Sequence, residues 1–285
     1  VNSHHKILAV YSQPANKANR GQKVVASSIE FFAKKHSLNI RTPTKLDIDE
    51  EYNFLKELKP DIVIVVAYGK IIPKRFLNLS KFGFINVHAS LLPKWRGAAP
   101  IQRSIMNLDN ETGISIMKIV EGLDSGPVMQ QNKIKINENI DSLTLSKVLS
   151  KLGAKSIIEA IKKIEKGEAK FVEQDHNQTT YAKKILKTEA RIQWNETARK
   201  ILSKINGLNP NPGAWFEFKG QRYKVWKAKI LSQKGDPGKI LDNKLTVACK
   251  DKAIKILEIQ KEGKDRQETE QFLLGNKMKQ GESIF

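Results

Sequence analysis

One segment of this sequence limits its fold more than any other. Six consecutive apolar residues, Ile62 to Ala67, follow Pro60-Asp61 and end at Tyr68-Gly69. A strand that is apolar on both faces is typical of the inside of a parallel sheet, where helices cover both sides. The sequence therefore predicts an α/β domain with this strand near its centre.

Strand and helix signals alternate around that segment. Apolar runs typical of strands lie at 7–11, 38–40, 83–88 and 114–120. Helical apolar spacing is found at 24–35, 99–106 and 142–164. Such alternation is the βαβ pattern of an open, parallel-rich sheet, so residues 1–166 are predicted to form one Rossmann-like domain.

The pattern changes beyond this domain. Residues 167–195 are polar and weakly periodic, and a helix is predicted at 196–205. Residues 167–206 are therefore predicted to form a linker. The breaker-rich stretch Gly207 to Gly213 then opens a C-terminal domain, 207–285. Its short strand signals, at 214–218, 222–228, 238–241, 245–248 and 253–259, predict a small β-barrel.

Charge points to a polyanionic partner. The chain has 50 Lys and Arg against 30 Asp and Glu, a net charge of +20. Phosphate neutralisation drives most nucleic-acid affinity, so RNA or DNA leads, and a membrane surface is a second possible partner. The alternative is an AT-rich genome, which favours lysine without any selection for binding. No apolar run reaches the roughly 20 residues that cross a bilayer. Cys249, a single cysteine, allows no internal disulfide, and we expect no metal site.

The residues best suited to chemistry cluster near the strand at 83–88. Asn86 and His88 are two apart, so they share one face of that strand near its end, where open α/β sheets bind ligands. An amide donating to an oxyanion and an imidazole handling a proton suit acyl transfer. Asp124, in a glycine-flanked loop, is the carboxylate expected to orient His88. Taken singly, each residue also has an ordinary structural interpretation.

Two other kinds of enzyme fit less well. No Ser/His/Asp or Cys/His pattern accompanies these residues, so transfer without a covalent enzyme intermediate is preferred. A dinucleotide-dependent oxidoreductase would need a Gly-x-Gly-x-x-Gly turn after a strand, and the sequence has none.

Several motifs resemble those of the folate-dependent formyltransferase family. They are Asn86-x-His88 with Ser90-Leu91-Leu92-Pro93, and Gly122-Leu123-Asp124-Ser125-Gly126. Further stretches are similar to the methionyl-tRNA branch, and they are 66–69, 95–103 and 190–194. The resemblance extends over essentially the whole chain. It implies a Rossmann-like formyltransferase domain followed by a C-terminal barrel that resembles oligonucleotide-binding domains.

The resemblance also implies a reaction and its site. The formyl donor would be 10-formyltetrahydrofolate, a co-substrate, and the acceptor would be the amino group of methionyl initiator tRNA. Asn86, His88 and Asp124 would be catalytic. Six residues would line the folate pocket, and they are Tyr68, Gly69, Ser90, Leu91, Leu92 and Pro93.

Contacts with tRNA are expected in two places. The polar stretch 13–23 resembles a loop that, in this family, lies against the tRNA acceptor end, and its Arg20 and Lys23 would contact phosphate. In the C-terminal domain, Arg222 and Lys224 alternate with Tyr223, near Trp226, a pattern that suits backbone contact with base stacking. Alternating lysines are also typical of any exposed strand.

The chain departs from the family pattern at its beginning. Family members open with a strand and a Gly-Thr-Pro-like turn ahead of the segment that matches Ile7 to Tyr11, whereas this sequence starts at Val1. We therefore expect about one strand-helix unit to be missing and the 285-residue chain to fold poorly or to be nearly inactive.

The remaining expectations concern setting and alternatives. We expect a monomer that associates with tRNA and folate and with no membrane, in the bacterial cytoplasm, with an organellar location left open. The alternative functions are another folate-dependent formyltransferase, acting on a ribonucleotide or an amino sugar, and a non-catalytic RNA-binding relative.

Overall fold

The computed structural model describes residues 3–18 and 23–284. It divides the chain into two compact units, which are residues 1–88, 115–130 and 157–174, and residues 89–114, 131–156 and 175–285. Within the described residues, no helix has the length and apolar character needed to span a membrane.

The first unit begins with small parallel and antiparallel pairs. β1 (Val10–Tyr11) pairs in parallel with β4 (Ile40–Arg41), and β2 (Asn16–Ala18) forms a hairpin with β3 (Lys23–Val25). The helices that follow are α1 (Ser28–Lys35) and α2 (Asp49–Leu58).

The predicted helix at 24–35 starts later than expected. Lys23 to Val25 pair with the preceding strand, and the β-branched Val24 and Val25 favour that extended conformation. The helix begins only at Ser28, because the side chain of Ser27 accepts a hydrogen bond from the Glu30 backbone N–H at 2.9 Å and caps it. The strand predicted at 7–11 is likewise reduced to two residues.

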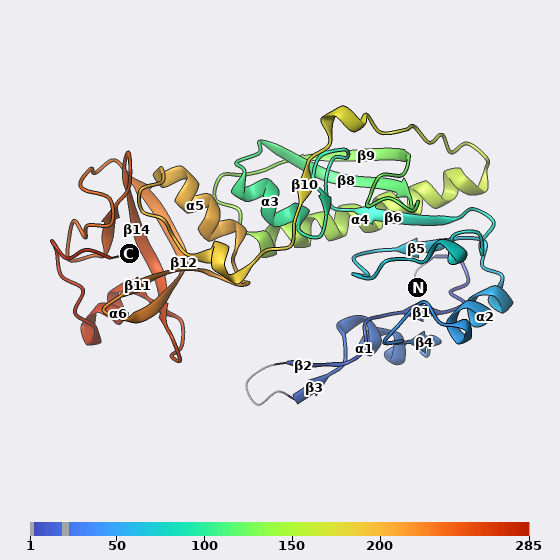
Figure 1. Ribbon diagram of the computed structural model, residues 1–285, viewed down its shortest axis with the longest axis horizontal. Coiled ribbons are helices and arrows are strands. Elements are labelled where there is room, and N and C mark those ends of the chain that lie inside the picture. Colours follow the sequence, from blue (N-terminus) through green and yellow to red (C-terminus); the bar gives the residue numbers. More distant parts are fainter. Residues whose placement is uncertain (1–2, 19–22, 285) are drawn as a thin grey trace. The chain divides into compact units, whose positions relative to one another are not determined.

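A four-stranded sheet carries the residues that matter most. Its order is β5-β6-β8-β9, where β5 (Val63–Val65) pairs in parallel with β6 (Phe84–His88), and β6 pairs antiparallel with β8 (Glu111–Lys118). Figure 1 shows these strands side by side. β9 (Val128–Lys135) was not expected from the sequence.

The predicted central strand differs from expectation. In the part of the chain that the structure describes, β5 stands first in its sheet, and its three residues are half-buried. It ends before Ala67, whose φ of 46° is left-handed, and Val66 is exposed. The fully buried strand of this sheet is instead β8, which is buried on both faces from Thr112 to Met117.

The apolar core of the first unit packs around Leu46, Leu55, Phe76 and Phe84. A 3-10 helix, η1 (Lys74–Phe76), supplies Phe76. The helix α4 (Ser142–Glu165) matches the prediction at 142–164 within one residue.

The second unit joins short elements to an antiparallel sheet. β7 (Arg96–Gly97) pairs in parallel with β10 (Tyr181–Ala182), and α3 (Pro100–Met106) packs against α5 (Ala198–Gly207). Two 3-10 helices, η2 (His176–Gln178) and η3 (Lys187–Ala190), lie between α3 and α5 in the sequence.

The C-terminal sheet has the order β11-β12-β14-β13, with β15 paired to β14. Its strands are β11 (Ala214–Phe218), β12 (Gln221–Leu231), β13 (Thr246–Ala248), β14 (Ala253–Lys261) and β15 (Gln267–Glu268). Figure 1 shows α5 and α6 (Thr269–Gly275) beside these strands. Of the predicted strand at 238–241, only isolated bridges at Lys239 and Ile240 form.

The core of this sheet includes the end of the predicted linker. Ile201, Leu202 and Ile205 of α5 are buried in one apolar cluster with Phe216 and Val225 of the sheet. The helix predicted at 196–205 is thus an integral part of the C-terminal fold.

Candidate active site

β6 presents the two residues expected to do the chemistry. Asn86 lies opposite Met117 of β8, and His88 lies opposite Ser115. Both belong to the same face because successive side chains of a strand alternate. The side chain of His88 is 6% exposed, so it sits in a largely water-excluded environment.

Asp124 meets this pair from the loop between β8 and β9. One of its carboxylate oxygens lies 3.6 Å from Nδ1 of His88, and the other lies 3.4 Å from the amide nitrogen of Asn86. The structure therefore brings together all three predicted catalytic residues. Asn86, His88 and Asp124 are called the catalytic cluster below.

The loop that carries Asp124 is tightly constrained. Asp124 has a φ of 44°, in the left-handed region that L-residues adopt rarely and that aspartate tolerates better than most. A β-carbon on Gly126 would collide with the carbonyl oxygen of Lys118, and one on Gly122 would collide with the hydroxyl of Ser125. Glycine at 126 allows the loop to lie close to the end of β8, and glycine at 122 allows it to turn tightly on itself.

The cluster has the parts that acyl transfer requires. The amide of Asn86 is a donor for a developing oxyanion, and the imidazole of His88 accepts or gives a proton. The carboxylate of Asp124 is close enough to stabilise an imidazolium. Separations of 3.4 and 3.6 Å are long for hydrogen bonds, as is common for catalytic groups before substrate binds.

Tyr68 and Gly69 of the predicted folate pocket lie in the first unit. The Tyr68 carbonyl accepts a hydrogen bond of 2.5 Å from the side chain of Gln13. Gly69 has a φ of 74°, and a β-carbon there would contact the same amide nitrogen. Burial, followed by the negative charge of Glu51, raises the pKa of the Tyr68 hydroxyl, which therefore stays protonated.

Ser90 to Pro93 belong to the second unit and continue the chain beyond His88. Ser90 is fully buried, and its hydroxyl donates to the Lys94 carbonyl at 2.6 Å. The carbonyl of Leu92 accepts from the Gln131 side chain at 2.7 Å, and the peptide bond between Leu92 and Pro93 is cis. A β-carbon on Gly113 would press against Leu91. The segment is thus firmly packed within its own unit.

The residues predicted to contact the tRNA acceptor end are only partly described. Arg20 lies outside the described residues. The backbone of Lys23 is in β3, opposite Ala18, and its side chain also lies outside the described part of the structure.

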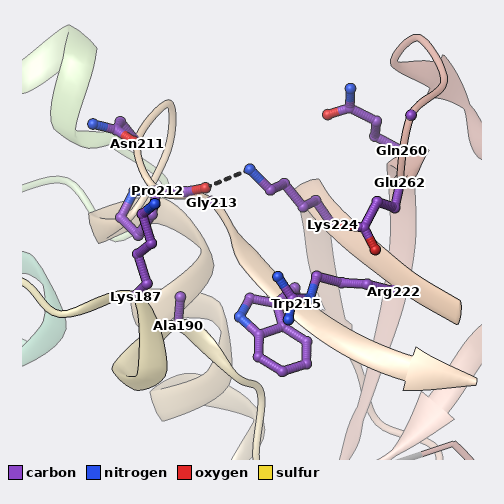
Figure 2. A pocket seen from close by; sticks show the side chains of 11 residues that line it. Lys187, Ala190, Asn211, Pro212, Gly213, Trp215, Arg222, Lys224, Gln260 and Glu262 are labelled. Carbon is purple, nitrogen blue, oxygen red and sulfur yellow. Dashed lines mark hydrogen bonds between the residues drawn. The ribbon is translucent and has the colours of Figure 1, made fainter. Parts of the chain in front are cut away.

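Arg222 and Lys224 line a pocket of about 430 Å³ in the second unit, shown in Figure 2. Lys187 adds a third cation to its wall, and Trp215 adds an aromatic ring. The guanidinium of Arg222 lies 4.1 Å from the centre of that ring. This group of four residues is called the basic pocket below.

Electrostatics within the basic pocket favour an anion. Burial, followed by the positive charge of Arg222, lowers the pKa of Lys224. Its ammonium donates to the Pro212 carbonyl at 2.7 Å, the interaction dashed in Figure 2. An anion beside Lys224 would favour the protonated form. Gln260 and Glu262 also line the pocket, and Glu262 contributes one negative charge.

The predicted role of two aromatic residues as stacking platforms is wrong. Tyr223 is buried and stacks on Phe216 with ring centres 5.6 Å apart, and Trp226 is buried with its N–H donated to Gln260 at 3.0 Å. Trp215, which was not among the predicted contacts, lines the pocket instead. Trp215 of β11 is paired with Lys224 of β12, which becomes evident only once the register of the hairpin is known.

One group of side chains in the described residues could hold a metal ion. Ligand atoms of His4, His5 and Glu165 all lie within 4.8 Å of one another. His5 Nδ1 is 3.4 Å and His4 Nε2 is 3.9 Å from the same carboxylate oxygen. No metal site was predicted, because the sequence has no cluster of Cys and His with zinc-ligand spacing. Glu165 joins the two histidines only through the fold, since it is far from them along the chain.

The chain matches two family models. Residues 1–161 match "Formyl transferase", and residues 184–277 match "Formyl transferase, C-terminal domain".

Curated relatives are similar over nearly the full length. "Methionyl-tRNA formyltransferase" of Pelagibacter ubique is 52% identical over 98% of this chain and 90% of the relative. The protein of the same name from Carboxydothermus hydrogenoformans is 41% identical over 99% of this chain and 93% of the relative.

Two solved structures share the fold. A Helicobacter canadensis N-formyltransferase, in complex with folinic acid and dTDP-3-aminofucose, has a TM-score of 0.65 and 18% identity, covering 88% of this chain and 87% of its own. Methionyl-tRNA formyltransferase from Clostridium thermocellum has a TM-score of 0.54 and 19% identity, covering 71% of this chain and 87% of its own. The family models and the curated relatives establish that the chain belongs to the formyl transferase family, in its methionyl-tRNA formyltransferase branch.

Proposed function

We propose that this chain transfers the formyl group of 10-formyltetrahydrofolate to the amino group of methionine on initiator tRNA. The observation that carries the proposal is the catalytic cluster, in which an amide, an imidazole and a carboxylate converge at the end of β6. Membership of the methionyl-tRNA formyltransferase branch supports the identity of donor and acceptor.

The cluster suits a direct transfer. The methionine amine attacks the formyl carbon, forming the new C–N bond and placing negative charge on the former carbonyl oxygen. Asn86 donates a hydrogen bond to that oxygen, while His88 takes the proton that the amine loses. The bond from the formyl carbon to N10 of the folate then breaks, and N10 receives the proton that His88 took from the amine.

Asp124 acts through His88 and with Asn86 in this scheme. Its negative charge stabilises the imidazolium that forms when His88 holds the amine proton. The second carboxylate oxygen faces the Asn86 amide and orients it. No covalent enzyme intermediate is required, because the amine is itself a sufficient nucleophile once it is deprotonated.

We place the folate beside Tyr68 and Gly69 and along Ser90, Leu91, Leu92 and Pro93. Support comes from the family resemblance, from the hydrogen bond to the Tyr68 carbonyl and from the firm packing of Ser90 to Pro93, since a flat ring needs rigid apolar walls and a few backbone hydrogen bonds. Two structural neighbours are described with folates bound, tetrahydrofolic acid in one and folinic acid in the other.

The basic pocket is proposed to bind the sugar-phosphate backbone of the tRNA. Lys187, Arg222 and Lys224 provide the positive charges, and the net charge of +20 attracts a polyanion from a distance. Arg20 and Lys23 stay proposed as contacts near the acceptor end. The domain limits at 166 and 206, a monomeric state and a bacterial cytoplasmic location also remain proposals, the last supported by the bacterial relatives.

The experiment that tests this function is a transfer assay with radiolabelled formyl donor and methionyl initiator tRNA. His88→Ala and Asn86→Ala should each reduce kcat/KM at least 100-fold. His36→Ala and Asn53→Ala, at exposed positions of the same unit, are the matched controls and should retain wild-type rates.

The outcome of the assay separates the proposed function from the two alternative functions. If the wild-type protein formylates an amino sugar or a ribonucleotide but not methionyl-tRNA, it is another formyltransferase of the family. If it binds tRNA but transfers no formyl group, it is a non-catalytic RNA-binding relative and the proposed function is wrong.

A further inference from the structure

A short segment after α4 lies against the loop that carries Asp124. Val172 forms an isolated antiparallel bridge with Val128, with hydrogen bonds of 2.8 and 2.9 Å in the two directions. The ring of Phe171 lies under the Lys118 ammonium, 4.5 Å from it. The segment therefore contacts both the end of β8 and the start of β9, the two strands that the loop connects.

Gln174 makes the contact with the loop itself. Its side-chain nitrogen donates to the carbonyl of Asp124 at 2.9 Å and to the carbonyl of Gly126 at 2.7 Å. A carboxamide has two N–H donors, so one glutamine satisfies both carbonyls. Gln174 is 7% exposed, which places these bonds away from solvent, where losing a donor is costly.

These two hydrogen bonds hold the loop at the residue whose backbone conformation is least favourable. Asp124 holds a left-handed φ of 44°, a conformation that persists only when surrounding contacts enforce it. Gln174 holds the carbonyl of Asp124 and the carbonyl two residues later. The Asp124 carboxylate projects from this part of the loop and lies 3.6 Å from Nδ1 of His88 and 3.4 Å from the amide nitrogen of Asn86.

We propose that Gln174 is a positioning residue for formyl transfer, holding the Asp124 loop so that the carboxylate faces His88 and Asn86. This inference rests on the proposed function of the catalytic cluster. It gives a specific role to part of 167–206, which the sequence suggested was a polar linker.

The test is kinetic and uses Gln174→Ala, Asp124→Ala and the double variant. Gln174→Ala should lower kcat about 10- to 100-fold, since small misplacements of a catalytic group cost this much, while KM for both substrates changes less than about threefold. In the Asp124→Ala background, Gln174→Ala should have little further effect, because the residue it positions is already absent.

Gln174→Glu supplies a readout that general destabilisation does not imitate. A protonated carboxyl donates one hydrogen bond to the loop, whereas an ionised carboxylate repels both carbonyls. The activity of Gln174→Glu relative to wild type should therefore fall as the pH rises through the pKa of the introduced carboxyl. Gln178→Ala, at an exposed glutamine four residues later, is the control and should be unaffected at every pH.

The outcomes separate this inference from the proposed function. Wild-type protein that transfers no formyl group overturns the proposed function itself. Active wild-type protein with kinetically additive losses in the double variant, or with a Gln174→Ala defect confined to KM, overturns only the role of Gln174.

Discussion

The carboxylate of Asp124 lies 3.6 Å from Nδ1 of His88, although the two are 36 positions apart along the chain and belong to different elements. His88 ends a strand, and Asp124 stands in a loop whose backbone is left-handed at that residue. The catalytic cluster thus depends on how the loop after β8 is held as much as on its side chains.

Removing only the charge of Asp124 should disable transfer. Asp124→Asn keeps the size of the side chain but cannot stabilise an imidazolium on His88, so kcat is expected to fall at least 100-fold with KM little changed. The measurement is steady-state formyl transfer. A kcat within tenfold of wild type would show that the carboxylate has no part in catalysis.

Adding a methyl group to the loop should affect both stability and activity. In Gly126→Ala the new β-carbon collides with the Lys118 carbonyl, which forces the loop away from β8. We expect a loss of about 1–3 kcal/mol in the free energy of unfolding together with reduced kcat. Gly275→Ala, where a β-carbon meets open space, is the control and should change stability by less than about 0.5 kcal/mol. Chemical denaturation gives both values.

A partly buried ion pair should make stability depend on pH. Arg41 donates two hydrogen bonds of 2.7 Å to the Glu51 carboxylate, and this arrangement lowers the pKa of Glu51 below its ordinary value of 4.5. A lowered carboxyl pKa stabilises the fold above the ordinary pKa, and the contribution is lost as pH falls through the lowered pKa.

The comparison that tests it is wild type against Glu51→Gln. Near neutral pH the variant should be less stable by about 1.5–3 kcal/mol, and the difference should shrink on acidification. Glu50→Gln removes the exposed second partner of Arg41 and should cost under about 1 kcal/mol. A difference that stays constant down to acid pH would argue against the ionic origin.

The basic pocket should contribute through charge rather than sequence recognition. Lys224→Ala and Arg222→Ala should each weaken tRNA binding and reduce the slope of log affinity against log salt by about one if each side chain contacts one phosphate. Filter binding over a series of salt concentrations measures this. Lys234→Ala, exposed and outside the pocket wall, should leave the slope unchanged, and an unchanged slope for all three would remove the pocket from the tRNA interface.

Local pattern was a good guide wherever a single segment decided the outcome. The predicted helix at 142–164 matches α4, and the strand at 214–218 matches β11, because each depends on the spacing of apolar side chains within the element. The pattern failed at Val24 and Val25, where pairing with the preceding strand took precedence over helical spacing.

The helix α2 was not predicted, although Tyr52, Leu55 and Leu58 have helical spacing. Its first turn is acidic, Asp49-Glu50-Glu51, and its buried residues are Glu51 and Leu55. Tyr223 and Trp226 were predicted to stack on RNA bases, because aromatic and basic residues alternate in this segment of the sequence. Their burial follows from strand pairing and core packing, which sequence does not display.

The sequence by itself determined the order of an α/β domain and an antiparallel C-terminal sheet, and it placed Asn86 and His88 on one strand face, because both follow from period and proximity along the chain. Only the tertiary structure decided which groups meet that face. Asp124 reaches Asn86 across 38 residues, and Gln174 reaches Asp124 across 50, since strand pairing and loop packing, rather than local propensity, bring such distant residues together.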